Sequence, residues 1–110
     1  MSETISFKDW QKIDIRVGTI LEARPHPNAD KLLILRIDEG KEELRQLVAG
    51  IKGHYSEKEL IGKQIVFLAN LEPKELRGEI SNGMILAAVK GDSLAILTVD
   101  RKVPNNAKVQ

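Results

Sequence analysis

The alternation of hydrophobic and polar residues along the chain predicts a protein built mainly from β-strands. Between Ile13 and Arg24, apolar or small side chains stand at every second position, which is the period of a strand with one buried face. Gly18 lies at the centre of this segment, and a residue without a side chain favours a sharp bend there. Five further strands are predicted from apolar runs: Leu32–Asp38, Arg45–Ala49, Gln64–Ala69, Met84–Val89 and Leu94–Val99.

Two short helices are predicted from their capping residues. A serine N-cap begins one helical turn over Ser6–Gln11. In the segment Gly50–Gly62, the run Ser56–Glu59 has the capping-box pattern, and the final glycine is placed to end the helix. A turn that contains two prolines, Pro25–Lys31, separates the first two strands.

The order of these elements predicts an all-β fold. Three strands, a small helix and then further strands, without any βαβ rhythm, match a five-stranded OB-fold barrel with an additional C-terminal strand and the polar tail Arg101–Gln110. We expect residues 1–110 to form a single domain. The runs Met84–Val89 and Leu94–Val99 are apolar on both faces, so we expect the terminal segments or a second subunit to cover the face outside the barrel.

Composition narrows the classes of function. The hydrophobic share of 42% and the charged share of 30% are typical of a soluble globular protein. The net charge of +1 argues against a protein that coats nucleic acid indiscriminately, although it permits a local basic face. The absence of cysteine excludes disulfides, thiolate metal sites and a cysteine nucleophile. A charged N-terminus and the lack of a long apolar run predict a cytoplasmic location.

The connection Ala69–Met84 stands out between two apolar runs. It is too long for a tight hairpin, and Pro73, Gly78 and Gly83 argue against one continuous helix or strand through it. It carries amides, a lysine, an arginine and a hydroxyl. Long connections anchored by rigid strands often carry function, so we expect a binding site here.

Four motifs occur in order along the chain: Asp14–Gly18, His26–Leu32, Leu68–Pro73 and Leu76–Met84. Together they resemble the tRNA-binding domain family. That family includes the C-terminal or separate β-subunit module of methionyl-tRNA synthetases, stand-alone tRNA-binding proteins, endothelial-monocyte-activating-polypeptide-like domains, and a chaperone branch linked to protein export. The similarity covers nearly the whole chain. It implies an OB-fold, usually a homodimer, that binds the outside corner of folded tRNA by structure rather than by sequence.

The candidate site residues combine this resemblance with side-chain chemistry. Arg77 is the best candidate for a phosphate contact, because a guanidinium fork suits phosphate oxygens; the alternative is an ion pair with Glu72 or Glu75. The resemblance places Ser81 and Met84 in the RNA-binding groove, whereas the sequence alone makes Met84 a core residue. The full set of candidates is Asn28, Lys31, Lys52, Lys63, Asn70, Lys74, Arg77, Ser81, Asn82 and Met84.

The sequence leaves two points about this set open: the role of Asn70 and the source of the positive charge. The Asn70 amide either binds RNA or caps the backbone of the connection. The connection Ala69–Met84 is not locally basic, since three glutamates oppose one lysine and one arginine. Phosphate contacts therefore need help from Lys31, Lys52 or Lys63, or from a partner chain.

No chemistry other than binding is indicated. His26 and His54 are the two histidines of the chain, and no acidic ligands stand at a spacing typical of a metal site. No phosphate loop or Ser/His/Asp arrangement is present, so we expect neither an enzyme nor a cofactor. Of the four aromatic residues, Tyr55 alone is predicted to be free for base stacking, which favours recognition of folded RNA through backbone and shape.

The resulting hypothesis is a dimeric tRNA-binding module that serves a methionyl-tRNA synthetase and raises its affinity for tRNA without contributing chemistry. One alternative is an export-related chaperone-like dimer that binds unfolded peptides. Another is a purely structural dimerisation module that docks on a synthetase. The residues expected at the dimer interface are Phe7, Trp10, Ile85 and Leu97.

Overall fold

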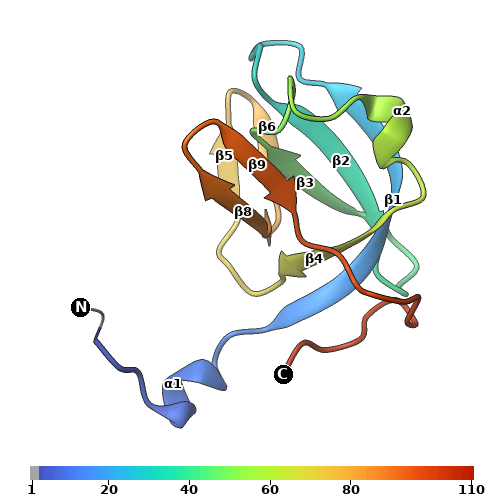
Figure 1. Cartoon of the computed structure of the whole chain (residues 1–110). Helices are drawn as coiled ribbons and strands as arrows, with labels where there is room; N and C mark the ends of the chain where they lie inside the picture. Colours follow the sequence, from blue (N-terminus) through green and yellow to red (C-terminus); the bar gives the residue numbers. More distant parts are fainter. Residues whose placement is uncertain (1–2) are drawn as a thin grey trace.

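The computed structural model describes residues 3–110 and confirms an all-β protein with two one-turn helices (Figure 1). In chain order the elements are α1 (Phe7–Trp10), β1 (Ile15–Pro25), β2 (Leu33–Asp38), β3 (Arg45–Ala49), α2 (Glu57–Leu60), β4 (Gln64–Leu68), β5 (Lys74–Leu76), β6 (Glu79–Ser81), β7 (Met84–Ile85), β8 (Ala87–Lys90) and β9 (Ser93–Ile96). None of the helices described is long and apolar enough to cross a membrane.

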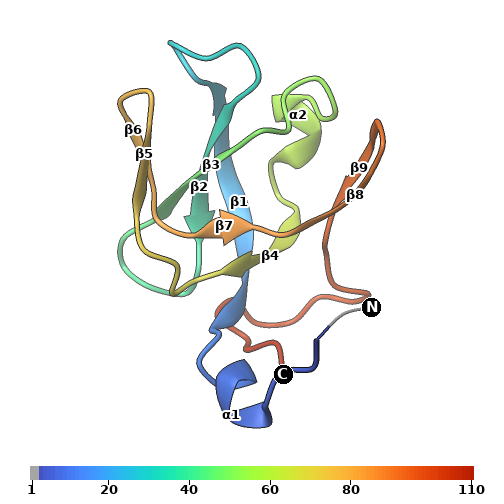
Figure 2. The same cartoon turned by 90° about the vertical axis from the view of Figure 1, so that its left-hand side faces the viewer.

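Five strands form the barrel predicted from the sequence. Their order in the sheet is β3-β2-β1-β4-β7, with every neighbouring pair antiparallel, and the sheet curls until β3 and β7 approach each other (Figure 2). The long strand β1 makes this possible because its first half pairs with β4 and its second half pairs with β2. Gly18 permits the close packing: a Cβ there would lie 2.5 Å from Ile37 Cγ2 and 3.1 Å from the Asp38 carbonyl oxygen. The architecture is therefore an OB-like barrel.

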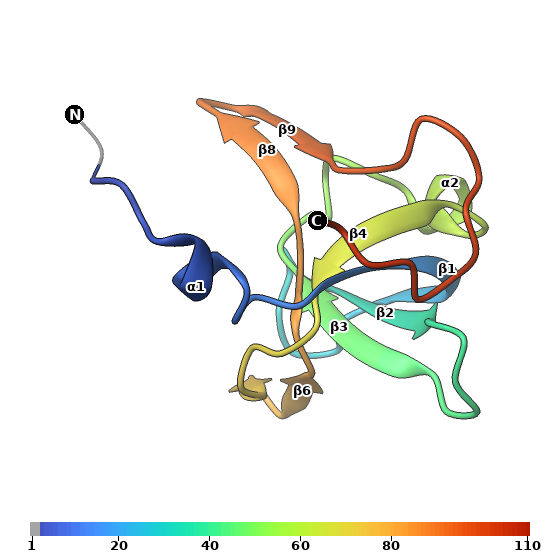
Figure 3. The same ribbon diagram turned by 90° about the horizontal axis from the view of Figure 1, so that it is seen from below.

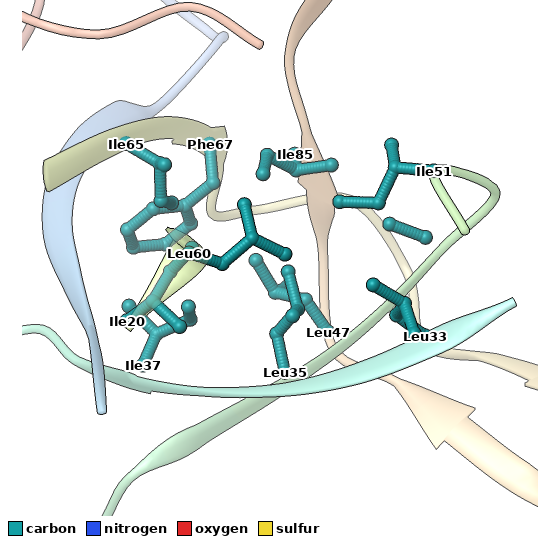
Figure 4. Close-up of a cluster of buried hydrophobic side chains, with 11 residues drawn as sticks. Ile20, Leu33, Leu35, Ile37, Leu47, Ile51, Leu60, Ile65, Phe67 and Ile85 are labelled. Carbon is teal, nitrogen blue, oxygen red and sulfur yellow. The ribbon is translucent and has the colours of Figure 1, made fainter. Parts of the chain in front are cut away.

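The core of the barrel is aliphatic apart from Phe67. Figure 4 shows side chains from β1, β2, β3, β4 and α2 pointing toward one another around Leu35, Leu60 and Phe67, all of which are fully buried. Ile85 belongs to this same cluster. Because Ile85 is 9% exposed and packs within its own chain, it offers little surface to the dimer interface in which it was expected.

The predicted strand Met84–Val89 is broken in the structure. β7 joins the barrel, but at Leu86 the chain leaves it, and β8 pairs only with β9 as a separate two-stranded ribbon. The break is fixed by the backbone of Leu86, whose N–H donates to Val66 O at 2.9 Å and whose carbonyl accepts from Leu97 N–H at 2.9 Å. Ile96 packs toward the core, while Val89 is exposed. The runs Met84–Val89 and Leu94–Val99 are therefore apolar on both faces because they form a ribbon that packs on the barrel, not because they are central strands.

The C-terminal segment is paired with β1 instead of forming a free polar tail. Asn106 N–H donates to Val17 O at 2.7 Å, Val17 N–H donates to Ala107 O at 3.0 Å, and Val109 N–H donates to Ile15 O at 2.9 Å. Figure 3 shows this segment beside β1, while α1 projects away from the barrel. The C-terminal segment thus pairs with the edge of β1; the outer side of the runs Met84–Val89 and Leu94–Val99 stays partly exposed, with Val89 and Leu97 accessible.

The helix caps follow the sequence pattern. In α2 the Ser56 hydroxyl accepts from Glu59 N–H at 3.2 Å, and the Glu59 carboxylate accepts from Ser56 N–H at 3.1 Å, which completes the capping box. The N–H of Ser56 and, to a smaller extent, its hydroxyl lower the pKa of Glu59, because their hydrogen bonds stabilise the charged carboxylate. The predicted turn of helix at Ser6 forms with Ser6 as N-cap.

Candidate nucleic-acid interface

The connection Ala69–Met84 contains a tight hairpin that the sequence analysis did not predict. β5 and β6 pair in register, and the two residues Arg77 and Gly78 form the turn between them. Both have positive φ, 52° for Arg77 and 93° for Gly78, which is the geometry of a type I′ turn. The usual sequence signature is Asn-Gly or Asp-Gly, so an arginine in the first position hid the turn. The left-handed conformation costs energy at Arg77 because its Cβ crowds the backbone.

Arg45 holds both ends of this hairpin. Its Nη1 donates to Ala69 O at 3.1 Å and to Asn82 O at 2.6 Å, the carbonyls on either side of the hairpin. The rest of the guanidinium forms two hydrogen bonds with the buried carboxylate of Glu39, at 2.9 and 3.2 Å, and its carbon lies 5.2 Å from the centre of the Phe67 ring. A largely buried ion pair in the barrel therefore fixes where the hairpin begins and ends.

The turn of the hairpin meets the loop between β1 and β2, residues 26–32. Figures 1 and 2 show both at the same end of the barrel. An open cavity of about 360 Å³ lies between them, and it is lined by Asn28, Ala29, Asp30, Lys31, Leu32 and Arg77. Three predicted site residues, Asn28, Lys31 and Arg77, are thus brought together from two motifs that lie far apart in the sequence. In an OB-fold, the loops that correspond to these two frame the usual nucleic-acid groove.

The groups around this cavity suit an anion. Lys31 and Arg77 supply two cations against the single carboxylate of Asp30. Among residues 3–110, no carboxylate forms an ion pair with Arg77; its nearest hydrogen-bond acceptor is Asn28 O, 3.5 Å from Nη1. The alternative ion pairs of Arg77 with Glu72 or Glu75 are therefore not formed. Within the described residues, no three His, Asp or Glu side chains converge as a metal site.

His26 connects the loop to the hairpin from underneath. Its side chain is buried, Nδ1 accepts from Asn28 N–H at 2.9 Å, and Nε2 lies 2.8 Å from the carbonyl oxygen of Leu76. Because a carbonyl can only accept, the ring proton must be on Nε2. From the sequence, this histidine was considered only as a metal ligand, and its position between the loop and the hairpin was missed. The signal available was a histidine next to proline within one of the four family motifs.

A polar network supports the second strand of the hairpin, next to its turn. Gln46 Nε2 donates to Ile80 O at 3.0 Å and to the Glu79 carboxylate at 3.2 Å. Arg24 lies 3.6 Å from the same carboxylate, and Arg36 donates to Gln46 at 3.4 Å. The sequence analysis singled out none of these residues. They hold the hairpin against the outer face of β1, β2 and β3.

Three of the predicted contacts lie at the return of the hairpin into the barrel. Ser81 is buried; its hydroxyl accepts from Val48 N–H at 3.0 Å and donates to Gly83 O at 2.9 Å. This hydroxyl anchors the hairpin and is not free for RNA. The Met84 side chain is 47% exposed, so it is not the core residue that the sequence alone suggested. The Asn82 side chain is exposed beside it.

The Asn70 amide holds backbone, but that of the segment leading into β1 and not that of its own connection, as the alternative to RNA binding had it. Its Oδ1 accepts from Asp14 N–H at 2.9 Å, and its Nδ2 donates to Lys12 O at 2.6 Å. Both functions of the amide are therefore used to hold the chain that leads into β1. A role in RNA binding would require these hydrogen bonds to break.

The remaining predicted lysines lie outside the cavity. Lys63 is placed over the Tyr55 ring, 6.0 Å from its centre. Lys74 is exposed on β5, opposite Ser81. Lys52 follows β3 in a segment that reaches the cavity end of the barrel, since a Cβ on Gly50 would lie 3.9 Å from Leu32 Cδ2.

Comparisons with known proteins give related sequences and related folds. The methionine–tRNA ligase of Pyrococcus horikoshii is 51% identical over 108 residues; the match covers 98% of this chain and 15% of the ligase. A crystal structure of a MetRS related protein from Pyrococcus horikoshii superposes with a TM-score of 0.91 at 32% identity, covering 99% of this chain and all of that one. The chaperone CsaA from Bacillus anthracis gives a TM-score of 0.91 at 30% identity, covering 98% of this chain and all of CsaA.

The chain thus spans only a small part of the ligases that it matches, and nearly the full length of the two solved structures. The sequence model described as "Putative tRNA binding domain" matches residues 15–108, which includes the barrel, the hairpin and the paired C-terminal segment. On these grounds the chain belongs to the tRNA-binding domain family.

Proposed function

We propose that this chain binds the outer corner of folded tRNA through the cavity between residues 26–32 and the turn of the β5–β6 hairpin. The observation that carries the proposal is the convergence of Lys31 and Arg77 on one open cavity, with no carboxylate paired to Arg77 among the described residues. A guanidinium fork binds two phosphate oxygens at once, and an ammonium adds a compact charge beside it.

Recognition of tRNA shape fits the aromatic residues better than stacking on single-stranded bases does. Phe67 is fully buried in the core. The Tyr55 hydroxyl accepts from Ile96 N–H at 3.1 Å, and its ring packs against the core with Lys63 above it. Tyr55, predicted from the sequence to be free, is therefore occupied. A site without stacking platforms reads folded RNA through its backbone and shape.

The biological role that we propose is non-catalytic. The module holds tRNA near a methionyl-tRNA synthetase and so raises the effective concentration of tRNA at that enzyme. The 51% sequence identity to a methionine–tRNA ligase, over 98% of this chain, supports a methionyl-tRNA synthetase as the partner. We propose that it does so in the cytoplasm, as a single binding domain.

We also propose that two copies associate through the N-terminal region and the ribbon. Phe7 is 71% exposed on α1, and Leu97 is 41% exposed after β9. Trp10 is half-buried and lines a small cavity with the C-terminal residues 108–110. Burial of these side chains in a dimer removes apolar surface from water, and it doubles the number of phosphate-binding cavities on a protein of nearly neutral charge.

Sedimentation velocity tests both parts of the proposal in one experiment. At micromolar concentration the protein alone is expected to sediment as a dimer, and addition of folded tRNA is expected to shift it into a faster complex. Phe7→Ser serves as the matched control, because it removes an exposed apolar contact of the proposed interface and leaves the cavity intact. A compact wild-type monomer would contradict the dimer, and free protein beside free tRNA would contradict the binding function.

A chaperone-like function is the second candidate. Leu71, Ile80 and Met84 are exposed apolar residues of the connection Ala69–Met84, and a protein described as a chaperone superposes closely on this chain. Unfolded peptides bind apolar surface, whereas tRNA phosphates need Lys31 and Arg77. Loss of tRNA binding without loss of peptide binding, after replacement of these two cations, would separate the two functions.

A further inference from the structure

We infer that His26 is a positioning residue of the proposed tRNA site, which it serves by locking the β1–β2 loop to the turn of the β5–β6 hairpin. The inference rests on the proposed function, since it concerns the relative placement of Lys31 and Arg77. The imidazole is only 4% exposed and therefore does not itself contact a ligand in the cavity. Its two nitrogens instead form hydrogen bonds with the two segments that line the cavity, the β1–β2 loop and the β5–β6 hairpin.

The two hydrogen bonds of the ring have different reach. The bond from Asn28 N–H to Nδ1 is local, because it spans two residues and shapes the loop itself. The bond from Nε2 to Leu76 O joins residues 50 positions apart and attaches the loop to the last residue of β5. Arg77 follows Leu76 directly, so this second bond fixes the backbone from which the guanidinium extends.

Among the described residues, no comparable link joins the turn to the loop; on the other side of the turn, Glu79 is held by Gln46 and Arg24 of the neighbouring strands. The other hydrogen bond between the turn and the loop, from Arg77 Nη1 to Asn28 O, is 3.5 Å long and is lost when the guanidinium turns to a phosphate. Arg77 also has a left-handed backbone, which is unfavourable for an arginine in isolation. Residues in such conformations persist only where the surroundings impose them. The Nε2 bond of His26 is one such restraint, at the point where the turn begins.

The consequence for binding is preorganisation. A phosphate held by Lys31 and Arg77 together requires the loop and the turn at a fixed separation. If the turn moves freely, tRNA binding must order it, and that ordering lowers the affinity without removing any contact group. His26 therefore acts on affinity through Arg77 rather than by contact.

Two replacements separate the local bond from the long-range bond. In His26→Asn, the side-chain oxygen occupies the place of Nδ1 and still accepts from Asn28 N–H, but the amide is too short to reach Leu76 O. In His26→Gln, the longer side chain places an amide nitrogen near the position of Nε2 and still donates to Leu76 O. Both variants are neutral and polar, so they serve as controls for each other.

The experiment compares tRNA affinity and amide hydrogen exchange in the three proteins. A net hydrogen bond contributes about 1 kcal/mol, so His26→Asn is expected to weaken tRNA binding roughly fivefold and to speed exchange at Arg77 and Gly78 by a similar factor. His26→Gln is expected to stay close to wild type in both measurements. A nitrogen correlation spectrum of the wild-type imidazole is expected to show the proton on Nε2.

The outcomes are separable. If wild-type protein binds tRNA and the two variants bind equally well or equally poorly, the ring only fills space and the inference is overturned. A proton on Nδ1 overturns it as well. If wild-type protein does not bind tRNA, the proposed function fails; the exchange comparison then decides by itself whether His26 couples the loop to the turn.

Discussion

Replacement of both Lys31 and Arg77 by alanine is expected to lower the affinity for tRNA by at least about a hundredfold, because each charged hydrogen bond to phosphate contributes about 1.5–3 kcal/mol. Both side chains line the cavity between the β1–β2 loop and the hairpin turn, and both are exposed. Fold stability should change little, since neither forms an ion pair among the described residues. Filter binding at fixed ionic strength measures the affinity, and denaturant unfolding measures the stability.

The matched control is the double replacement of Arg101 and Lys102 by alanine. It removes the same charge from exposed positions that line a different cavity, next to Gln64 and Thr98. We expect this control to weaken tRNA binding only slightly, as a general loss of positive charge does. Equal losses in the two double variants would contradict a specific site and would leave net charge as the source of the affinity.

The geometry of the cation at position 77 gives a finer comparison within the same experiment. Arg77→Lys keeps the charge but loses the planar fork, so it should recover only part of the affinity that Arg77→Ala loses. Full recovery by lysine would indicate that charge alone is recognised at this position.

Replacement of Arg45 by alanine is expected to reduce the free energy of unfolding by about 3–5 kcal/mol, the usual cost of removing one partner of a buried ion pair. The side chains of Arg45 and Glu39 are 16% and 6% exposed. Without the guanidinium, the Glu39 carboxylate stays buried with only Lys41, 3.8 Å away and largely exposed, as a partner. The carbonyls at both ends of the hairpin lose a donor as well. Denaturant unfolding at neutral pH measures the loss.

Arg101→Ala is the control for this stability prediction. Arg101 also forms an ion pair, with Nη2 3.2 Å from Asp100 Oδ2. The side chains of Arg101 and Asp100 are 86% and 88% exposed, and such exposed pairs contribute little to stability. A small effect of Arg45→Ala, comparable with that of the control, would contradict the view that this ion pair fixes the hairpin. A loss of tRNA affinity in the folded fraction of Arg45→Ala would link the barrel to the site.

The sequence predicts those parts of the fold that are determined by local pattern. The capping box of α2 and the strands β1 to β4 are confirmed. The period of two predicts the strand β1 but not its core face, because a bulge lies between Ile20 and Glu22: Ile20 is buried in the core, and Leu21 is 44% exposed. The four motifs identify the family, which the sequence model over residues 15–108 also shows. The capping box and each single motif consist of residues that are close together in the sequence.

The parts that could not be predicted depend on contacts between distant residues. The hairpin was hidden because Arg77 takes the turn position where asparagine or aspartate is usual. The break at Leu86 follows from its hydrogen bonds to Val66 and Leu97. Nothing local shows that the Asn70 amide and the Ser81 hydroxyl are fully used in holding backbone.

His26 illustrates the same limit at the site. Its motif was recognised as part of the family pattern, but its role depends on a carbonyl 50 residues away. Lys31 and Arg77 were both predicted as binding residues from the family resemblance together with their chemistry, whereas their convergence on one cavity became visible only in the structure. The chemistry of a side chain follows from its residue type, whereas its neighbours in the fold include residues far away in the sequence.

A competition experiment tests the central claim most directly. Labelled, folded tRNA is bound to the protein and displaced either by the same tRNA unlabelled or by its two separate arms, each a hairpin without the corner where the arms meet. If the protein reads the folded corner, intact tRNA of any species competes well, each arm competes at least tenfold more weakly, and affinity falls steeply as salt rises. Equal competition by the separate arms or by unfolded tRNA would contradict the account.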